Sequence, residues 1–203
     1  MKRTKTLLNL FAIYLLVAVP FKVMEIIPGF TDIRPVVLLG PIYGIFFGIT
    51  GCGVMAVGNL IMDIVSDSLR WSSIAGFIAN FLGPWCFWFY WTRSSREPFS
   101  LRTGKSVLRH CGVIVFSAFL EGMIITPAVI LIYPNVNSNL FALTLLANNV
   151  LFPVFFGIPL LILMQEELGF APVWRGSPVN RETASPGGEK VSESVRSAEN
   201  EQY

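Results

Sequence analysis

The sequence predicts an all-α membrane protein, a polytopic bundle of six transmembrane helices with cytoplasmic N and C termini. Of its 203 residues, 53% are hydrophobic and only 14% are charged, and the mean hydropathy is +0.61. Soluble domains usually have about 25% charged residues. In addition, only Asp63, Asp67 and Arg70 are charged between Arg34 and Arg93. A chain with so long an apolar region is expected to lie in a lipid bilayer.

The composition also excludes several classes of protein. An ordinary soluble domain or a disordered chain would carry more charge. A nucleic-acid-binding protein needs a concentrated basic face, and the net charge here is only +2. The three cysteines, Cys52, Cys86 and Cys111, are odd in number and form no C-x-x-C motif. Neither a disulfide framework nor a zinc site is therefore predicted.

Six apolar stretches account for the predicted spans. A helix needs about 20 residues to cross a hydrocarbon core of about 30 Å, and some stretches reach this length only with their flanks. The stretches are Thr6–Ile27, Val36–Phe47, Cys52–Ile64, Ile74–Trp91, Val107–Tyr133 and Leu140–Met164. The first continues past Val19 without a small-x-small cleavage motif, so we interpret it as an uncleaved helix rather than a signal peptide.

The second and third stretches are short and share a glycine-rich joint at 48–53. Two interpretations are open: a pair of short spans, which we favour, or one re-entrant hairpin. Asp32 and Arg34 precede the pair, and Asp67 and Arg70 follow it. Both ends are therefore expected to reach water on the same side of the membrane, and the remaining topology is the same under either interpretation.

Glycines recur every four residues in the second stretch, at Gly40, Gly44 and Gly48. In lipid the hydrophobic effect does not drive helices together, and small residues allow their backbones to approach closely. The spacing therefore predicts helix packing rather than ligand contact.

Basic residues predict the orientation, because cytoplasmic loops carry an excess of Lys and Arg. Three basic residues precede the first helix, and five follow the fourth: Lys2, Arg3 and Lys5, then Arg93, Arg96, Arg102, Lys105 and Arg109. With six spans, both segments lie on the same side as the C-terminus. We therefore expect a multi-pass protein of the cell (inner, cytoplasmic) membrane.

The composition divides the chain into two parts. Residues 1–165 form the predicted six-helix domain, whose apolar faces contact membrane lipid. Residues 166–203 are rich in Ser, Glu, Gly and Pro. Such a segment buries too little apolar surface to offset its ordering entropy, so we predict a disordered cytoplasmic tail.

Enzyme chemistry finds little support in the sequence. The only histidine, His110, lies beside Arg109 at the start of the fifth predicted helix, where we expect a solvated interface residue. No nucleophile elbow, H-E-x-x-H motif, phosphate-binding loop or Asp-rich metal motif is present. We predict that the chain is not an enzyme, holds no cofactor or metal, and does not hydrolyse ATP by itself.

Polar side chains inside the predicted spans are the most informative residues, because each costs a few kcal/mol on insertion scales unless it is satisfied. They are Asn59, Asp63, Asn80, Glu121, Asn148 and Asn149. Asn59 and Asp63 are four residues apart and share a helix face. With the predicted orientation, Asn80 and Asn148 lie roughly 10 Å below the outer surface, and Glu121 lies near the middle of the membrane.

These depths predict one polar cavity that opens to the outside, with Arg34 at its mouth and Trp71 available for stacking. The candidate solute contacts are Arg34, Asn59, Asp63, Trp71, Asn80, Glu121 and Asn148. Two structural alternatives are open. The amides could form interhelical hydrogen bonds worth about 0.6 kcal/mol each, and Arg34 could pair with Asp63 or Asp32 to lock the helix ends.

Three segments carry a resemblance to a known family. They are Phe30-Thr-Asp-Ile-Arg-Pro35, Leu39-Gly-Pro-Ile-Tyr-Gly-Ile-Phe-Phe-Gly48 and Gly58-Asn-Leu-Ile-Met-Asp63. The chain resembles the S components, or substrate-specificity subunits, of energy-coupling factor transporters. These commonly show an Arg-Pro opening helix two, a Gly-spaced helix two and a Gly-Asn-x-x-x-Asp-like end of helix three. The resemblance covers about residues 30–90 in motif and 1–165 in span count.

The resemblance implies a six-helix bundle that binds a vitamin, its precursor or a metal ion from outside. It also implies docking on a coupling membrane subunit driven by two cytoplasmic ATPases, with toppling of the bundle carrying the solute inward. One departure concerns docking: the family often has Ala-x-x-x-Ala in helix one, whereas here Leu16 follows Ala12.

The sequence thus favours the substrate-binding membrane subunit of an uptake transporter. The alternative is a sensory or regulatory membrane module that binds a small ligand and signals through the Arg93–Arg109 loop or the tail. A structural assembly factor is a third hypothesis. The acidic and amide groups fit a polar heterocycle as well as a cation, so the sequence does not identify the solute.

Overall fold

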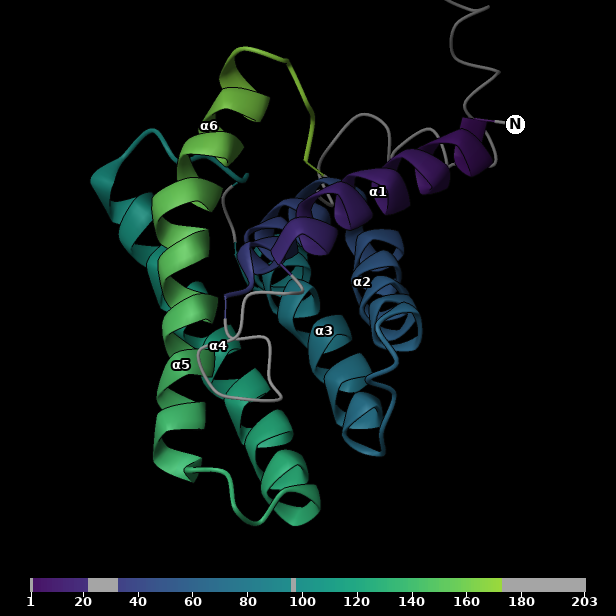
Figure 1. Cartoon of the computed structure of the whole chain (residues 1–203). Coiled ribbons are helices and arrows are strands. Elements are labelled where there is room, and N and C mark those ends of the chain that lie inside the picture. The colour runs from purple at the N-terminus through teal and green to yellow at the C-terminus, as the bar shows by residue number, and fades with distance from the viewer. Residues whose placement is uncertain (1, 22–32, 96–97, 173–203) are drawn as a thin grey trace, which may run out of the picture.

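The computed structural model describes residues 2–21, 33–95 and 98–172, and within them the only regular elements are helices. The predicted all-α fold is confirmed (Figure 1). The α-helices are α1 (Lys2–Ala18), α2 (Leu39–Val65), α3 (Ser72–Phe89), α4 (Gly104–Ile132), α5 (Ser138–Phe152) and α6 (Ile158–Glu166). Two 3₁₀ turns, η1 (Val19–Phe21) and η2 (Pro35–Leu38), and two π-helical turns, η3 (Tyr90–Ser94) and η4 (Pro153–Gly157), complete the list.

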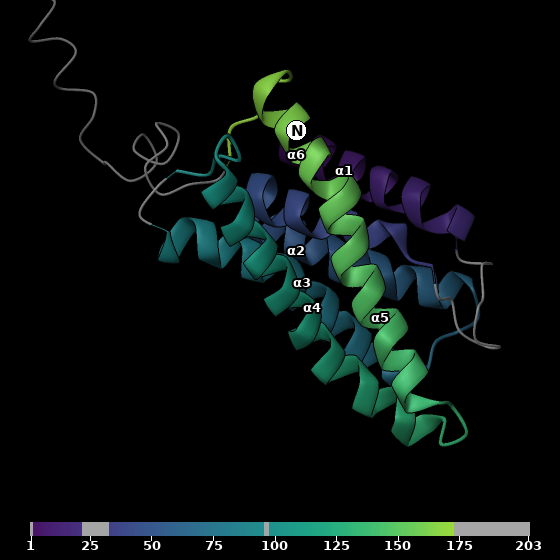
Figure 2. The ribbon, with the colours of Figure 1, turned by 90° about the vertical axis from the view of Figure 1, so that its left-hand side faces the viewer.

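Four helical stretches of the described chain are long and apolar enough to cross a membrane. They are Thr4–Phe21, Pro35–Val65, Gly104–Ile132 and Ser138–Glu166. The last runs through α5, η4 and α6 without interruption (Figure 2). These stretches support a membrane-embedded protein. The count of six spans and the cytoplasmic position of the termini stay predictions.

The outward faces of the long helices carry large apolar side chains. On α4 they are Leu108, Val115, Phe116, Phe119, Met123 and Leu131, each more than half exposed. A soluble monomer rarely exposes so large an apolar area. In a bilayer these side chains contact lipid, which removes the cost of exposing them to water.

Helix α2 is folded back on itself at Gly48. Gly48 has φ 57° and ψ −138°, a backbone conformation that residues with a Cβ rarely adopt. A Cβ on Gly51 would lie 2.2 Å from the carbonyl oxygen of Tyr43. In a straight helix, two residues eight positions apart, such as Tyr43 and Gly51, would be separated by about 12 Å along the axis. The segments 39–47 and 49–65 are therefore two arms of one helical hairpin.

The first arm is too short to be a full span. Together with η2 it reaches about 22 Å, less than the hydrocarbon core of about 30 Å. The geometry is closer to the hairpin alternative than to the two spans that the sequence favoured. Arg34 before the hairpin and Asp63 near its end line one cavity. The two ends of the hairpin therefore lie close together, as expected under either interpretation.

The first arm of α2 packs tightly on α3. A Cβ on Gly44 would lie 2.2 Å from the carbonyl oxygen of Pro84 and 3.3 Å from Cβ of Phe87. Two of the regularly spaced glycines therefore have distinct structural roles: Gly44 allows close packing, as predicted, and Gly48 forms the hairpin turn.

Helix α1 crosses over α2 rather than running beside α4 and α5 (Figure 1). Leu10 and Tyr14 are its buried residues, and the Tyr43 hydroxyl donates a 2.7 Å hydrogen bond to the Leu10 carbonyl. Leu8 and Leu16 are 64% and 75% exposed. Phe11, Leu15, Val17 and Ala18 are partly buried beside Leu10 and Tyr14, whereas the outward side of α1 carries uncovered apolar side chains.

The expectation that His110 is a solvated residue is wrong. His110 is fully buried, and Trp91 donates a 3.4 Å hydrogen bond from Nε1 to its Nδ1. The rings of Phe87 and Phe99 lie 5.4 and 6.1 Å from its ring. The loop that contains Phe99 covers the start of α4, and no local sequence pattern predicts that cover.

The end of α6 is tied to the loop before α4. Arg102 forms an ion pair with Glu166, and Gln165 donates a 2.9 Å hydrogen bond from Nε2 to the Phe99 carbonyl. Further on, the ring of Phe170 packs edge-on against Phe46. Residues 166–172 of the predicted tail are therefore ordered against the helical domain, and residues 173–203 lie outside the described residues.

Candidate functional site

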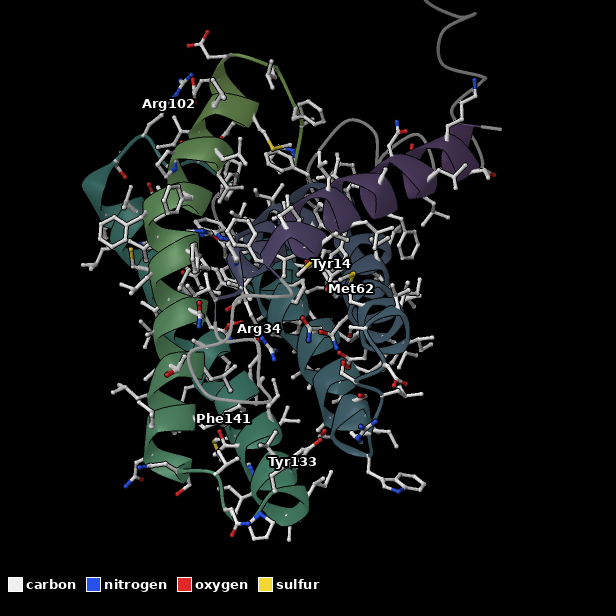
Figure 3. All side chains as sticks on the ribbon, in the orientation of Figure 1. Tyr14, Arg34, Met62, Arg102, Tyr133 and Phe141 are labelled. Carbon is white, nitrogen blue, oxygen red and sulfur yellow. The ribbon has the colours of Figure 1, made fainter. Side chains whose placement is uncertain are left out.

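Three of the predicted site residues line a cavity between α1, η2 and the second arm of α2, which we call the Asp63 cavity. Its volume is about 50 Å³. The lining residues are Tyr14, Ala18, Phe21, Ile33, Arg34, Pro35, Val36, Asn59, Met62 and Asp63. Figure 3 shows Tyr14 and Met62 together where α1 crosses α2, with Arg34 nearby at the entry to η2.

The hairpin in α2 explains how this cavity forms. Pro35 begins η2, because its fixed φ suits the first position of a helical turn. The second arm returns to the same level and presents Asn59 and Asp63, one turn apart, on one face. Tyr14 closes the cavity from α1, and its ring lies so close to Gly58 that a Cβ there would be 2.7 Å away.

The Asp63 cavity is polar and small. Arg34, Asp63 and Asn59 are among its lining residues, so the lining contains both hydrogen-bond donors and acceptors. A volume of about 50 Å³ accommodates a few water molecules, whereas sites for drug-sized ligands enclose about 300–1,000 Å³.

Two further predicted residues, Asn80 and Glu121, line a separate cavity between α2, α3, α4 and α5, which we call the Glu121 cavity. Its volume is about 20 Å³, which is room for one water-sized particle. Its lining residues are Val37, Gly40, Pro41, Met55, Asn80, Gly83, Pro84, Phe87, Ser117, Glu121, Asn149 and Pro153.

The Glu121 carboxylate is held by neutral partners. Asn149 donates from Nδ2 to Oε2 at 2.9 Å, and the Ser117 hydroxyl lies 3.0 Å from Oε1. The same hydroxyl lies 3.3 Å from the Gly83 carbonyl on α3. Oδ1 of Asn149 is buried without a hydrogen-bond partner, and Asn149 is 5% exposed.

The structure therefore divides the predicted residues between two cavities instead of gathering them in one. Turn η2 separates the cavities, since Val36 lines the first and Val37 lines the second. Asn148 lies in neither. Its Nδ2 donates to the Thr144 carbonyl at 2.9 Å, and its Oδ1 accepts from the Arg34 backbone N–H at 3.2 Å.

Trp71 lies apart from both cavities. It precedes α3 and is 81% exposed, so its position does not suit stacking on a solute in either cavity. A tryptophan near the end of a span is instead typical of the membrane–water interface.

Sequence reasoning missed Tyr14, Ser117 and Asn149 as site residues. Ser117 could have been found, because it lies one helical turn before Glu121. The sequence identifies Asn149 as an intramembrane amide but favours Asn148 as the solute contact. Neighbouring residues on a helix point about 100° apart, and the sequence alone did not indicate which one faces the carboxylate. Tyr14 gave no signal, because it lies in an apolar run.

No protein-family model, curated protein or solved structure matches the chain. In the part of the chain that the structure describes, no group of three or more His, Cys, Asp or Glu side chains could hold a metal ion. Function is therefore inferred from the geometry of the two cavities and from the sequence motifs.

Proposed function

We propose that this chain is the substrate-binding membrane subunit of an uptake transporter of the energy-coupling factor type, and that it binds a small polar solute in the Asp63 cavity. One observation carries the proposal. Two of the three motif segments behind the family resemblance, the Arg34-Pro35 pair and the segment with Asn59 and Asp63, line the same cavity. Residues that are separated by more than twenty positions meet there because α2 folds back at Gly48.

The chemistry of this cavity favours a solute with both donor and acceptor groups. Arg34 offers N–H donors, Asp63 offers acceptors, and the Asn59 amide offers both. A vitamin, a vitamin precursor or another polar heterocycle has this character, and a metal ion is the other class that the resemblance implies. With room for only a few water molecules, the cavity must widen before it admits a heterocycle.

Helix α1 is the element that can move to widen the cavity. Tyr14, Ala18 and η1 cover one side of it, and only Leu10 and Tyr14 are buried along α1. Phe11, Leu15, Val17 and Ala18 are only partly buried against the core, so α1 has fewer fully buried side chains than α2 and is the more readily displaced of the two helices. Outward movement of α1 would open the Asp63 cavity without disturbing the contact between α2 and α3.

The energy for uptake would come from partners, namely a coupling membrane subunit and two cytoplasmic ATPases. The uncovered apolar side chains of α1, including Leu8 and Leu16, are available for docking or for lipid. Since the chain lacks Ala-x-x-x-Ala in this helix, docking would use larger side chains than the family motif provides.

The test is mass spectrometry of the small molecule that remains bound after gentle extraction from native membranes. Wild-type protein should carry one defined solute. Asp63→Asn or Arg34→Ala should weaken its affinity by about tenfold, the effect of losing one charge-assisted hydrogen bond, and should therefore retain less of it. Asp67→Asn is the matched control, because Asp67 follows the same helix but does not line the cavity. ATPase subunits should copurify with the wild type. An empty wild-type protein, or equal occupancy in all variants, contradicts the proposal.

The sensory alternative has one observation in its favour. The Arg102–Glu166 ion pair and the Gln165–Phe99 hydrogen bond join the Arg93–Arg109 loop to the end of α6. A ligand-driven movement of α6 would therefore reach that loop directly. Deletion of residues 176–203 distinguishes the two functions: an uptake subunit keeps transport, whereas a sensor that signals through the tail loses its output.

A further inference from the structure

The Glu121 cavity has an excess of hydrogen-bond acceptors over donors. The single Ser117 proton faces two oxygen atoms, Oε1 of Glu121 and the Gly83 carbonyl. Asn149 uses its amide nitrogen on Oε2 of Glu121, and its own Oδ1 receives no hydrogen bond. A buried amide oxygen without a partner is destabilising, which indicates that a particle absent from the protein chain satisfies it.

Two prolines among the lining residues remove the helical donor from further carbonyl oxygens. Pro84 and Pro153 have no N–H, so the carbonyls four residues earlier, those of Asn80 and Asn149, lose their helical donor. All four of these residues line the cavity. The two segments have the same pattern, Asn80-Phe-Leu-Gly-Pro84 and Asn149-Val-Leu-Phe-Pro153. Helix α3 and the continuous stretch of α5 and η4 therefore each contribute to the cavity an asparagine and, four residues later, a proline that interrupts the helical hydrogen bonds.

The charge of the cavity indicates what kind of particle completes it. Glu121 is the only acidic residue in the lining, and no basic residue lines it. Arg34 acts on the Glu121 carboxylate electrostatically, but from outside the lining. A carboxylate at depth in a membrane requires a positive partner or a proton. One monovalent cation would neutralise it, whereas Ca²⁺ takes six to eight oxygen ligands and is usually held by several carboxylates.

We propose that the Glu121 cavity binds a single sodium ion. The Glu121 carboxylate and Oδ1 of Asn149 are its ligands, and the carbonyls freed by Pro84 and Pro153 are available to complete the shell. Freed carbonyls at interrupted helices are established ligands for Na⁺ in membrane transporters. Since its ligands come from α3, α4 and α5, the ion would stabilise the contact between these helices. This site is independent of the proposed solute site in the Asp63 cavity.

The experiment measures ²²Na⁺ binding to the full-length chain in lipid nanodiscs, together with thermal unfolding in NaCl or choline chloride at equal ionic strength. Wild-type protein should bind one ion per chain saturably. Its Tm should rise by about 3–6 °C at a sodium concentration tenfold above the Kd, with no rise in choline. Glu121→Gln and Asn149→Ala should abolish both effects.

Two controls separate this site from other features of the chain. Glu166→Gln removes a carboxylate that lies outside the cavity and should bind sodium like the wild type. Asp63→Asn should do the same, so loss of solute binding and loss of sodium binding are distinguishable. The wild-type measurement is decisive even if Glu121→Gln does not fold, because it requires no variant.

Three outcomes would overturn the proposal. The first is the absence of saturable sodium binding to the folded wild type. The second is undiminished binding by folded Glu121→Gln. The third is a Tm that depends on pH but is equal in sodium and choline, which would assign the cavity to a proton or a water molecule instead of sodium.

Discussion

Asn149 on α5 donates a 2.9 Å hydrogen bond from Nδ2 to Oε2 of Glu121 on α4. Its sequence neighbour Asn148 instead accepts a hydrogen bond from the Arg34 backbone. Two adjacent amides on one helix therefore have different roles: Asn149 lines the Glu121 cavity, and Asn148 accepts a hydrogen bond from the segment that carries Arg34. Helix α5 thus connects the two polar regions of the protein.

Removal of the Asn149 amide should weaken the contact between α4 and α5. We expect Asn149→Ala to lower the free energy of unfolding by about 1 kcal/mol, near the middle of the range for interhelical hydrogen bonds in membrane proteins. Equilibrium unfolding in mixed micelles, in choline buffer without sodium, measures this change. Asn139→Ala, at an exposed position of the same helix, is the control and should have no measurable effect. Equal stability of the two variants would contradict the assigned bond.

The hairpin in α2 should tolerate a methyl group at Gly53 but not at Gly51. A Cβ on Gly51 meets the Tyr43 backbone at 2.2 Å, whereas a Cβ on Gly53 meets nothing within 4 Å. Because backbone must move in the first case, Gly51→Ala should cost about 3 kcal/mol or more or prevent folding. Gly53→Ala should be neutral or slightly stabilising. Thermal stability in detergent compares the variants, and similar values would show that α2 does not fold back at Gly48.

Gly83 gives the Glu121 carboxylate its space. A Cβ on Gly83 would lie 2.2 Å from Oε1 of Glu121, so Gly83→Ala must push the carboxylate aside. The obstacle is the end of a flexible side chain, and we expect a cost of about 1–2 kcal/mol. Glu121→Ala should remove that cost, so a double-mutant cycle should give a coupling energy of at least about 0.5 kcal/mol. Gly112→Ala, whose Cβ meets nothing within 4 Å, is the control. Strict additivity of Gly83→Ala and Glu121→Ala would show that the two residues are not in contact.

His110 should be inaccessible to reagents in the folded protein. It is fully buried against Trp91, Phe87 and Phe99. Diethyl pyrocarbonate should modify it at least about tenfold more slowly than the same histidine in the detergent-unfolded chain, because modification requires local opening. His110→Ala should also cost about 2–4 kcal/mol through the cavity that it leaves. Rapid modification of the folded protein would contradict the burial of His110 and favour the solvated position that the sequence predicts.

The candidate site was only partly predictable. The i, i+4 spacing of Asn59 and Asp63 and the polar ends of the apolar pair predict that these residues lie near Arg34, and all three line one cavity. Depth in the membrane, however, placed Asn80, Asn148 and Glu121 in the same cavity as these residues. Depth is one coordinate, and it contains no information about the lateral position of a side chain. Turn η2 lies between the two cavities, with Val36 lining one and Val37 lining the other. It therefore separates polar residues whose predicted depths in the membrane are similar.

The sequence by itself determined the helical, membrane-embedded character of this protein, because charge is scarce and the apolar runs approach the length of a spanning helix, which satisfies its backbone groups within one segment. It also determined that both ends of the α2 segment reach the same level. Only the tertiary structure decided which of two neighbouring amides meets Glu121, that His110 is covered, and that the polar groups form two cavities. These features depend on helix rotation and on contacts between distant segments, and neither is encoded in local hydrophobicity or spacing.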